Sequence, residues 1–279
     1  MTSFRLLAFS LIGASALLAC GATGAKSSGA GHGGATAGPD GGAPDGADDG
    51  AVFFDAPTGD ATGACTHLNI GIFGNPGSNS SSNFQQWLVM SGTSVQRIQT
   101  TTTEPLTAAT LQPFDVVVLD WLTRDYTAGE AAIFSTWVSA GGGVASMSGY
   151  DNDTTDDWHG NTLLAPLQLA YTGSVMNGPV TIFAAHPITV GLTSVTFNGG
   201  YPISDLGGTA STRTPIAFLP GNVAVGYAVQ MASGRAFVWG DEWIEFDSEW
   251  STLPEIKQLW VQVFAWISPM NKCALMPPQ

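Results

Sequence analysis

From residue 65 onward, short apolar runs alternate with amphipathic stretches along the chain. The runs at 68–73, 114–120 and 144–147 have strand length, and their near-continuous apolar character indicates strands buried on both faces. A more polar run at 94–99 predicts a strand near a sheet edge. The stretches between these runs have helical spacing, and one of them begins with the capping box Thr127–Glu130. We predict helices at 84–92, 106–112, 127–140 and 161–167.

After residue 179 the helical spacing gives way to strands separated mostly by Gly, Pro and Asn. We predict strands at 180–183, 195–198, 215–219, 223–229 and 235–239, which form a β-rich extension or an antiparallel edge of the sheet. Gly234 indicates a tight hairpin before the last of them, and a final helix at 254–267 has one apolar face. The alternation of strand and helix before residue 179 is typical of parallel sheets. The predicted fold class is therefore α/β: a doubly wound, mainly parallel, flavodoxin-like sheet flanked by helices, with a β-rich C-terminal extension.

The first 20 residues have the pattern of an export signal. Arg5 gives a small positive region, and the apolar run at 6–19 is too short to span a bilayer. The run ends Leu17-Leu18-Ala19-Cys20, which resembles the bacterial lipobox, in which the cysteine is lipidated. The alternative is an ordinary signal peptide cleaved after Ala19. We expect a protein exported and anchored to the bacterial cell envelope through a lipid on Cys20, with the membrane as partner.

Residues 21–64 are rich in Gly, Ala, Ser, Thr, Pro and Asp, and almost nothing in them is apolar before Val52. Such a segment cannot bury enough surface to offset the entropy of ordering, so we expect a disordered linker. The domain boundaries predicted from the sequence are thus 1–20 for the signal peptide, 21–64 for the linker and 65–279 for the α/β domain.

Composition narrows the classes of function. The chain has 8 Lys and Arg against 22 Asp and Glu, a formal net charge of −14. Binding to the phosphate backbone of nucleic acid needs clustered cations, so we exclude nucleic acid as a partner. Apart from Cys20, the cysteines are Cys65 and Cys273, which bracket the predicted domain. An exported chain meets an oxidising compartment, which favours a disulfide between them over two free thiols.

Three segments resemble the class I glutamine amidotransferase-like superfamily, and more closely its trehalose-utilisation-type branch. They are the run at 114–120, the stretch at 137–144 that contains three glycines, and the His-Pro-containing turn at 186–192. The residues Trp239-Gly240-Asp241-Glu242-Trp243 fit as well. The resemblance covers about residues 66–268 and implies an amidotransferase-like α/β domain.

In that superfamily a cysteine nucleophile follows the strand that corresponds to 144–147, and the resemblance places Ser148 at this position. The flanking glycines of a serine elbow are absent, and where the family has a histidine after its last strand, this chain has Asp241 and Glu242. His159 and His186 remain as alternative partners for Ser148. Ser148 is therefore only a candidate catalytic residue.

Acidic residues and tryptophans follow two of the predicted strands, and the resemblance implies that both strand ends face one crevice. Converging carboxylates need a neutralising partner, and a hard cation such as Ca²⁺ would supply it. Carboxylates beside aromatic rings also suit a carbohydrate. The alternative is that these acids are solvated loop tips. The candidate ligand-binding residues are Asp151, Asp153, Trp158, Asp241, Glu242 and Trp243, and the candidate metal ligands among them are Asp151, Asp153, Asp241 and Glu242.

These observations favour a surface-anchored lipoprotein whose amidotransferase-like domain binds or interacts without catalysis. Its ligand would be a carbohydrate or another component of the cell envelope, or a cation, and no cofactor other than Ca²⁺ is indicated. The alternative is a hydrolase that acts on a carbohydrate or amide through Ser148 or the acidic crevice.

Overall fold

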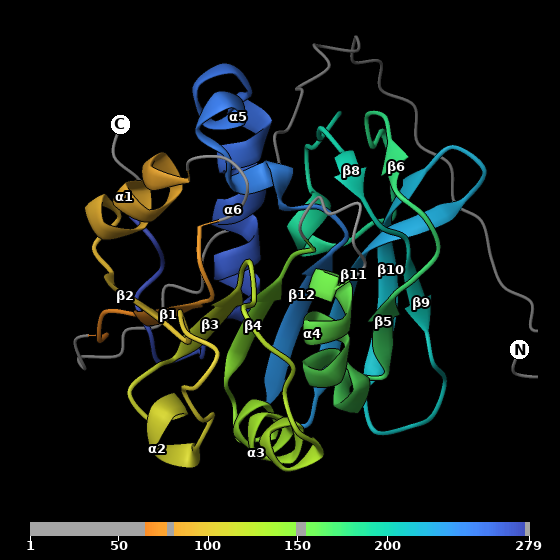
Figure 1. Ribbon diagram of the computed structural model, residues 1–279. Helices are drawn as coiled ribbons and strands as arrows, with labels where there is room; N and C mark the ends of the chain where they lie inside the picture. Colours follow the sequence, from red (N-terminus) through yellow and green to blue (C-terminus); the bar gives the residue numbers. More distant parts are fainter. Residues whose placement is uncertain (1–64, 77–80, 149–154, 277–279) are drawn as a thin grey trace, which may run out of the picture. The chain divides into compact units, whose positions relative to one another are not determined.

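The central sheet and its flanking helices follow the strand-helix alternation of the sequence (Figure 1). The computed structural model describes residues 65–76, 81–148 and 155–276, apart from the side chains of 155–158 and 251. Its eight sheet strands are β1 (Asn69–Phe73), β2 (Ser94–Ile98), β3 (Val116–Leu119), β4 (Gly143–Ser146), β7 (Ile182–Phe183), β10 (Thr212–Leu219), β11 (Val223–Met231) and β12 (Gly234–Trp239).

The strands of this sheet lie in the order β2-β1-β3-β4-β12-β11-β10-β7. The pairs from β2 to β12 are parallel, and the pairs from β12 to β7 are antiparallel. The chain moves from β1 to β2 on one side and to β3 on the other, so the strand order reverses between β1 and β3. In open α/β sheets, ligands bind outside the carboxyl ends of the strands at such a reversal.

Six α-helices and three 3-10 helices connect the strands of the described residues. They are α1 (Ser82–Met90), α2 (Ala108–Leu111), α3 (Ala128–Ser139), α4 (Thr155–Leu164), α5 (Asp247–Thr252), α6 (Pro254–Ile267), η1 (Ala165–Leu167), η2 (Pro187–Thr189) and η3 (Glu242–Glu245). None of the helices in this part of the chain is long and apolar enough to cross a bilayer.

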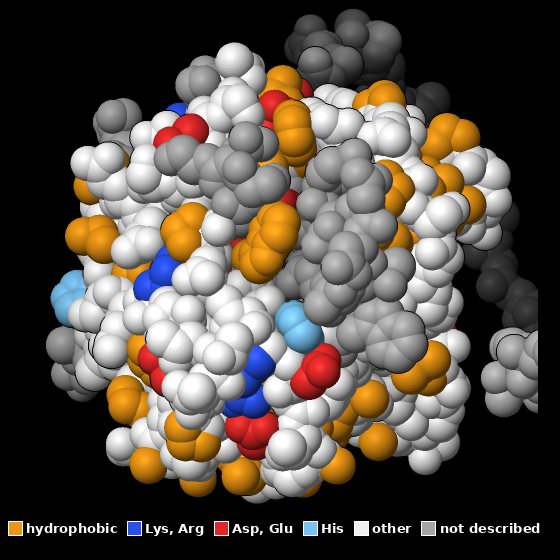
Figure 2. Space-filling view, viewed as in Figure 1, with side chains coloured by type: hydrophobic (Ala, Val, Ile, Leu, Met, Phe, Trp, Pro, Cys, Tyr) orange, Lys and Arg blue, Asp and Glu red, His pale blue; other side chains and the backbone are white. Residues whose placement is uncertain are grey.

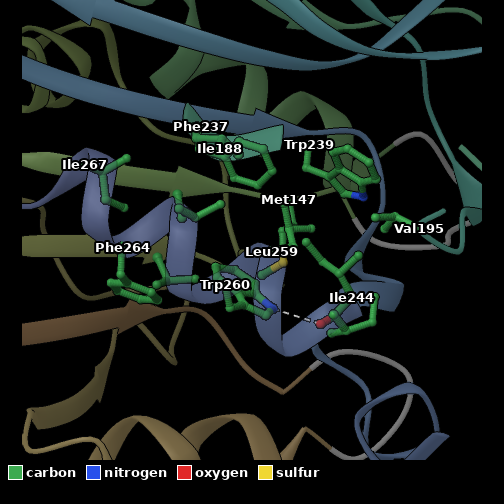
Figure 3. Close-up of a cluster of buried hydrophobic side chains, with 14 of the residues drawn as sticks. Met147, Ile188, Val195, Phe237, Trp239, Ile244, Leu259, Trp260, Phe264 and Ile267 are labelled. Carbon is green, nitrogen blue, oxygen red and sulfur yellow. Dashed lines mark hydrogen bonds between the residues drawn. The ribbon is translucent and has the colours of Figure 1, made fainter. Parts of the chain in front are cut away.

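Alternate residues of the central strands point to opposite faces of the sheet, which gives two hydrophobic layers. On one face, Ile72 and Val118 pack with the apolar sides of α1 and α6. On the other face, Val117 and Val144 pack with α3 and the end of α4. Figure 3 shows part of the first layer, where Trp260, Phe264 and Ile267 of α6 pack against the sheet. Helices thus cover both faces, and the predicted doubly wound, mainly parallel α/β class is confirmed.

The C-terminal strands form the antiparallel pairs β10–β11 and β11–β12, in agreement with the predicted β-rich extension, and β12 joins them to the parallel part of the sheet by pairing with β4. Gly143 of β4 pairs with Val116 on one side and with Arg235 on the other. The hairpin between β11 and β12 passes close to α3: a Cβ atom on Gly234 would lie 1.9 Å from the carbonyl oxygen of Val138. Only glycine fits there, since any side chain would collide with that backbone.

Two short antiparallel ribbons complete the described structure and were not predicted as such. They are formed by β5 (Leu169–Tyr171) with β9 (Ile203–Asp205), and by β6 (Met176–Asn177) with β8 (Asn198–Gly200). One helix prediction is corrected here: the helix expected at 161–167 begins earlier, at Thr155, so Asn161 lies inside α4. Its side-chain amide accepts from the backbone N–H of Tyr171 at 2.6 Å and donates to the carbonyl of the same residue at 2.9 Å.

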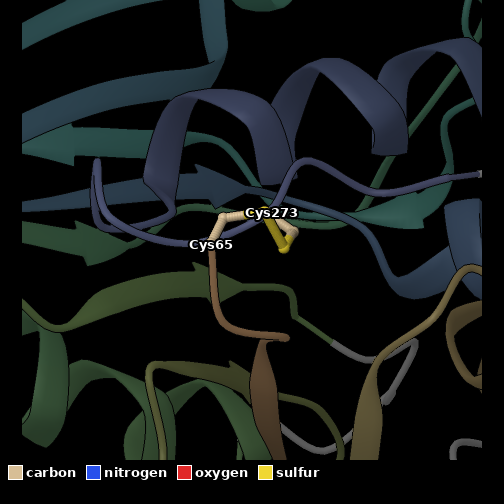
Figure 4. The surroundings of a disulfide bond; sticks show 2 residues. All are labelled: Cys65 and Cys273. Carbon is tan, nitrogen blue, oxygen red and sulfur yellow. A yellow bond between two sulfur atoms is a disulfide. The ribbon is translucent and has the colours of Figure 1, made fainter. Parts of the chain in front are cut away.

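Cys65 and Cys273 form a disulfide whose Cα atoms are 5.1 Å apart (Figure 4). Two further contacts hold the same segments together. The backbone N–H of Cys273 donates to the carbonyl of Thr66 at 2.9 Å, and the Lys272 ammonium lies 2.9 Å from the Asp115 carboxylate. These contacts hold the C-terminal segment against the residues that precede β1.

Candidate functional site

The segments that follow β1, β3, β4 and β12 lie at the same edge of the sheet, which we call its carboxyl edge. Gly74 follows β1, Asp120 follows β3, Ser148 lies two residues after β4, and Glu242 lies three residues after β12. The backbone N–H of Glu242 donates a hydrogen bond of 2.8 Å to the carbonyl oxygen of Ser148. The sequence treated Ser148 and Glu242 as neighbours only through the family resemblance, and the structure brings their backbones together directly.

Ser148 lies in the interior at this edge, with only 1% of its surface exposed. The two alternative partners of Ser148, His159 and His186, each contact other groups. His159 Nδ1 lies 2.8 Å from the exposed carboxylate of Asp125. His186 Nδ1 accepts a hydrogen bond of 3.2 Å from the N–H of Ile188, and burial lowers the pKa of this histidine. His67 precedes β1, at the opposite end of that strand.

Asp241 and Glu242 are adjacent in sequence but take different roles. The Asp241 carboxylate accepts bonds from the backbone N–H groups of Asn198 at 2.6 Å and Trp243 at 3.1 Å. It thereby caps η3 and ties it to β8. Burial raises the pKa of Asp241 to about 8, although these two hydrogen bonds act in the opposite direction. The carboxyl of Glu242 joins a different group.

That group consists of Asp120, Glu242 and Glu245. Each residue offers one carboxyl oxygen, and these oxygens all lie within 4.8 Å of one another. The three residues are 2%, 1% and 0% exposed, respectively. Burial raises the pKa of Glu245 well above its ordinary range, and the carboxylates of Asp120 and Glu242 raise it further, while Arg97 lowers it. We call these three residues the buried carboxylate cluster.

The guanidinium of Arg97 contacts the cluster through Asp120. Arg97 of β2 places Nη1 2.5 Å from Asp120 Oδ2 and donates from the same atom to the carbonyl of Gly74 at 3.1 Å. The other oxygen of Asp120 accepts a bond of 2.8 Å from the N–H of Trp121. This places Arg97, Gly74 and Asp120 together at the reversal of strand order between β1 and β3.

Sequence reasoning did not select Asp120, Glu245 or Arg97 as site residues. Asp120 ends the most continuous apolar strand of the chain, and that change from apolar to acidic is the signal that could have selected it. Glu245 is three residues after Glu242, and a single 3-10 turn brings residues with that spacing to one side. Nothing in the sequence around Arg97 marks it as a site residue, because only the order of β2, β1 and β3 in the sheet brings it beside Asp120.

The structure describes only some of the remaining candidate residues. Asp151 and Asp153 fall outside the described residues. Trp158 belongs to α4, but its side chain is not described. Trp243 is partly exposed and packs edge to face on Phe246, with ring centroids 5.3 Å apart. Of the six candidate ligand-binding residues, the structure therefore describes the side chains of Asp241, Glu242 and Trp243.

A second group of charged side chains lies in the loop after β3. Arg124 Nη2 is 2.6 Å from Glu130, which in turn completes the capping box of α3 with Thr127. The hydrogen bond from Arg124 lowers the pKa of Glu130 to about 2. On the face shown in Figure 2, basic, acidic and histidine side chains also lie close together near the centre. Arg124 and Glu130 are thus paired with each other, and Glu130 stabilises the first turn of α3.

Comparisons with known proteins agree on the fold. No protein-family model matches the chain, and no curated protein matches it. The N-terminal domain of mmIFT52 has a TM-score of 0.57 at 14% identity and covers 70% of this chain and 96% of its own. The cytoplasmic protein STM1381 from Salmonella typhimurium LT2 has a TM-score of 0.54 at 14% identity, with 72% and 100% covered. A ThuA-like protein from Parabacteroides merdae ATCC 43184 has a TM-score of 0.50 at 12% identity, with 77% and 94% covered.

At these identities the likeness concerns the fold alone. The chain has the class I glutamine amidotransferase-like fold, with ThuA-like and STM1381-type structures among its neighbours. The fold that the resemblance implied is therefore confirmed. What the domain does has to be argued from its own residues at the carboxyl edge of the sheet.

Proposed function

We propose that this protein is a lipid-anchored binding module of the bacterial cell envelope, and that its ligand contacts the carboxyl edge of the sheet. One observation carries the proposal. Where the resembling family would hold a nucleophile and a histidine, this chain joins Ser148 to Glu242 through the backbone and buries three carboxylates beside them. In place of the family's histidine, this edge offers buried acceptor oxygens, which suits binding better than activation of a serine nucleophile.

The outer part of this edge suits a carbohydrate of the envelope. The ring of Trp243 is partly exposed and is held by its edge-to-face contact with Phe246. A fixed, partly exposed indole can stack on the apolar face of a sugar ring. The buried carboxylates are too enclosed to accept hydroxyl bonds from a sugar directly, so the carbohydrate would contact the surface around Trp243.

Binding is tested by sedimentation of the full chain with purified insoluble cell-wall polysaccharide. Trp243→Ala should weaken retention by about two- to tenfold, since an aromatic stacking contact contributes about 0.5–1.5 kcal/mol. Trp137→Ala is the matched control, because Trp137 is also a partly exposed tryptophan but lies on α3. Equal retention of both variants, or no retention of the wild type, contradicts the carbohydrate ligand.

The hydrolase alternative is decided by the same preparation. Products released from the polysaccharide or from amide substrates are measured for the wild type and for Ser148→Ala. We expect no release by either protein. Release by the wild type that is abolished in Ser148→Ala would replace the binding function with catalysis.

The anchor is tested separately in cells. Metabolic labelling with a palmitate analogue should label the wild type, and Cys20→Ala should lose the label and leave the membrane fraction. A Cys20→Ala protein that stays in the membrane fraction contradicts anchoring through this residue.

A further inference from the structure

We infer that the buried carboxylate cluster of Asp120, Glu242 and Glu245 is a binding site for a hard divalent cation, of which Ca²⁺ fits best. The inference deepens the proposed function and rests on it in one respect, since both use the carboxyl edge of the sheet. The two can fail independently, because one concerns an ion in the interior and the other a ligand at the surface.

The first support is the charge of the cluster. Three carboxylates lie together in the interior, and Arg97 forms an ion pair with one of them, Asp120. When all three are ionised, three like charges repel one another within a small buried volume. Burying unpaired charge costs several kcal/mol per group, so the fold needs either a divalent cation or bound protons here.

The second and independent support is the side chain of Glu245. It is fully buried, and neither of its carboxyl oxygens meets a hydrogen-bond donor among the described residues. Buried polar side-chain atoms nearly always have a partner in native proteins. The carboxyl instead faces Asp120 and Glu242, which are acceptors themselves. A cation at the common centre would satisfy the Glu245 oxygens and separate the three like charges.

The ligand chemistry selects the kind of ion. All three donors are carboxylate oxygens, which suit hard cations and disfavour the softer metals that prefer imidazole or thiolate. The three oxygens all lie within 4.8 Å of one another, so one ion with oxygen ligands at about 2.4 Å, the distance typical of Ca²⁺, can contact all of them. Mg²⁺ dehydrates reluctantly and usually keeps several waters, which makes a fully buried cluster less suitable for it.

The position in the fold is also appropriate for a ligand. Asp120 follows β3 at the reversal of strand order, and η3 carries Glu242 and Glu245 from the end of β12 across to it. The turn is held by the Asp241 cap and by the hydrogen bond of 2.8 Å from Trp260 Nε1 to the carbonyl of Ile244 (Figure 3). Both carboxylates of η3 are therefore fixed by the packing of the residues between them.

The experiment is a thermal melt of the chelator-treated protein, titrated with CaCl₂ and in parallel with MgCl₂ at constant ionic strength. A cation that binds only the folded state raises Tm in proportion to the logarithm of its concentration. At about 100 times Kd, we expect a rise of about 5–10 °C with Ca²⁺ and a smaller rise with Mg²⁺. No rise in the wild type at up to millimolar Ca²⁺ overturns the inference and favours a proton shared between Glu245 and Asp120.

Glu245→Gln tests whether the ion occupies this cluster. The substitution keeps the shape of the side chain and removes one buried negative charge, so the metal-free variant should melt at or above the wild type. Its apparent Ca²⁺ affinity should fall by at least about tenfold. Glu249→Gln is the matched control, because Glu249 lies four residues further on in α5 and outside the cluster. A full Ca²⁺ response in Glu245→Gln places the ion elsewhere and overturns the assignment.

The polysaccharide assay separates this inference from the proposed function. Retention of the wild type on polysaccharide without any Ca²⁺ response overturns the cation site and leaves the carbohydrate ligand in place. A Ca²⁺ response that depends on Glu245, without retention on polysaccharide, supports the cation site and overturns the carbohydrate ligand.

Discussion

The backbone N–H of Glu242 donates to the carbonyl oxygen of Ser148 across 2.8 Å, and this bond joins the segment after β12 to the segment after β4. It continues the pairing of the two parallel strands beyond their ends. The turn that follows, η3, is thereby directed over the sheet edge rather than away from it. The carboxyls of Glu242 and Glu245 can reach Asp120 because of this direction.

Asp241 caps the start of η3, and its removal should lower the stability of the domain. Asp241→Ala leaves the backbone N–H groups of Asn198 and Trp243 without their acceptor and empties a buried site. Each loss of this kind costs about 1–3 kcal/mol, so we expect a decrease of about 2–4 kcal/mol in the free energy of unfolding. Urea denaturation at pH 7 measures it. Asp205→Ala, at a partly exposed ion pair with Arg213, should cost less than half as much. Equal losses in the two variants would contradict the capping role of Asp241.

The pair of Arg124 and Glu130 predicts a dependence of stability on pH. Arg124 holds the folded-state pKa of Glu130 at about 2, below the ordinary value of 4.5. The contribution of Glu130 to stability is therefore fully present above pH 4.5 and is lost as the pH falls towards 2. Glu130→Gln should cost about 1–2 kcal/mol at pH 7, because the pair lies near the surface, and almost nothing at pH 2. The difference between wild type and variant, measured by denaturation across this range, checks the prediction. A difference that is constant with pH would show that Glu130 acts through packing alone.

The central strands could be predicted because the apolar residues of each strand indicate, within that short stretch of sequence, that it is buried. The run that ends in Asp120 is apolar without interruption, and the capping box Thr127–Glu130 forms as its sequence indicates. The insertion of β12 beside β4 was not predictable, because a strand in a hairpin has the same local pattern whether it lies at an edge or in the middle of a sheet. The carboxylate cluster was missed for the same reason: Asp120 and Glu245 are far apart in sequence, and only the strand order brings them together.

The disulfide between Cys65 and Cys273 closes a loop with a sequence separation of 208 residues. A cross-link of this length restricts the unfolded chain strongly, and loop entropy sets its contribution at up to about 5 kcal/mol. We expect the double variant Cys65→Ser/Cys273→Ser to unfold at lower urea concentration while keeping the fold, since the hydrogen bond between Cys273 and Thr66 remains. Denaturation with and without reductant measures the effect. Reductant should destabilise the wild type alone, and an equal effect on the double variant would contradict a role for this disulfide.

Trp260 connects the stability of the domain to the proposed cation site. Its indole is fully buried in α6, and Nε1 donates to the carbonyl of Ile244, between the two carboxylates of η3 (Figure 3). Trp260→Phe removes this donor and leaves a small cavity, so we expect a loss of about 2–4 kcal/mol in the free energy of unfolding. Because η3 then loses a support, the Tm rise that Ca²⁺ produces should also become smaller. Trp266→Phe is the control, since Trp266 is partly exposed on the same helix and contacts His186. A Ca²⁺ response that survives unchanged in Trp260→Phe would show that the position of η3 does not depend on this hydrogen bond.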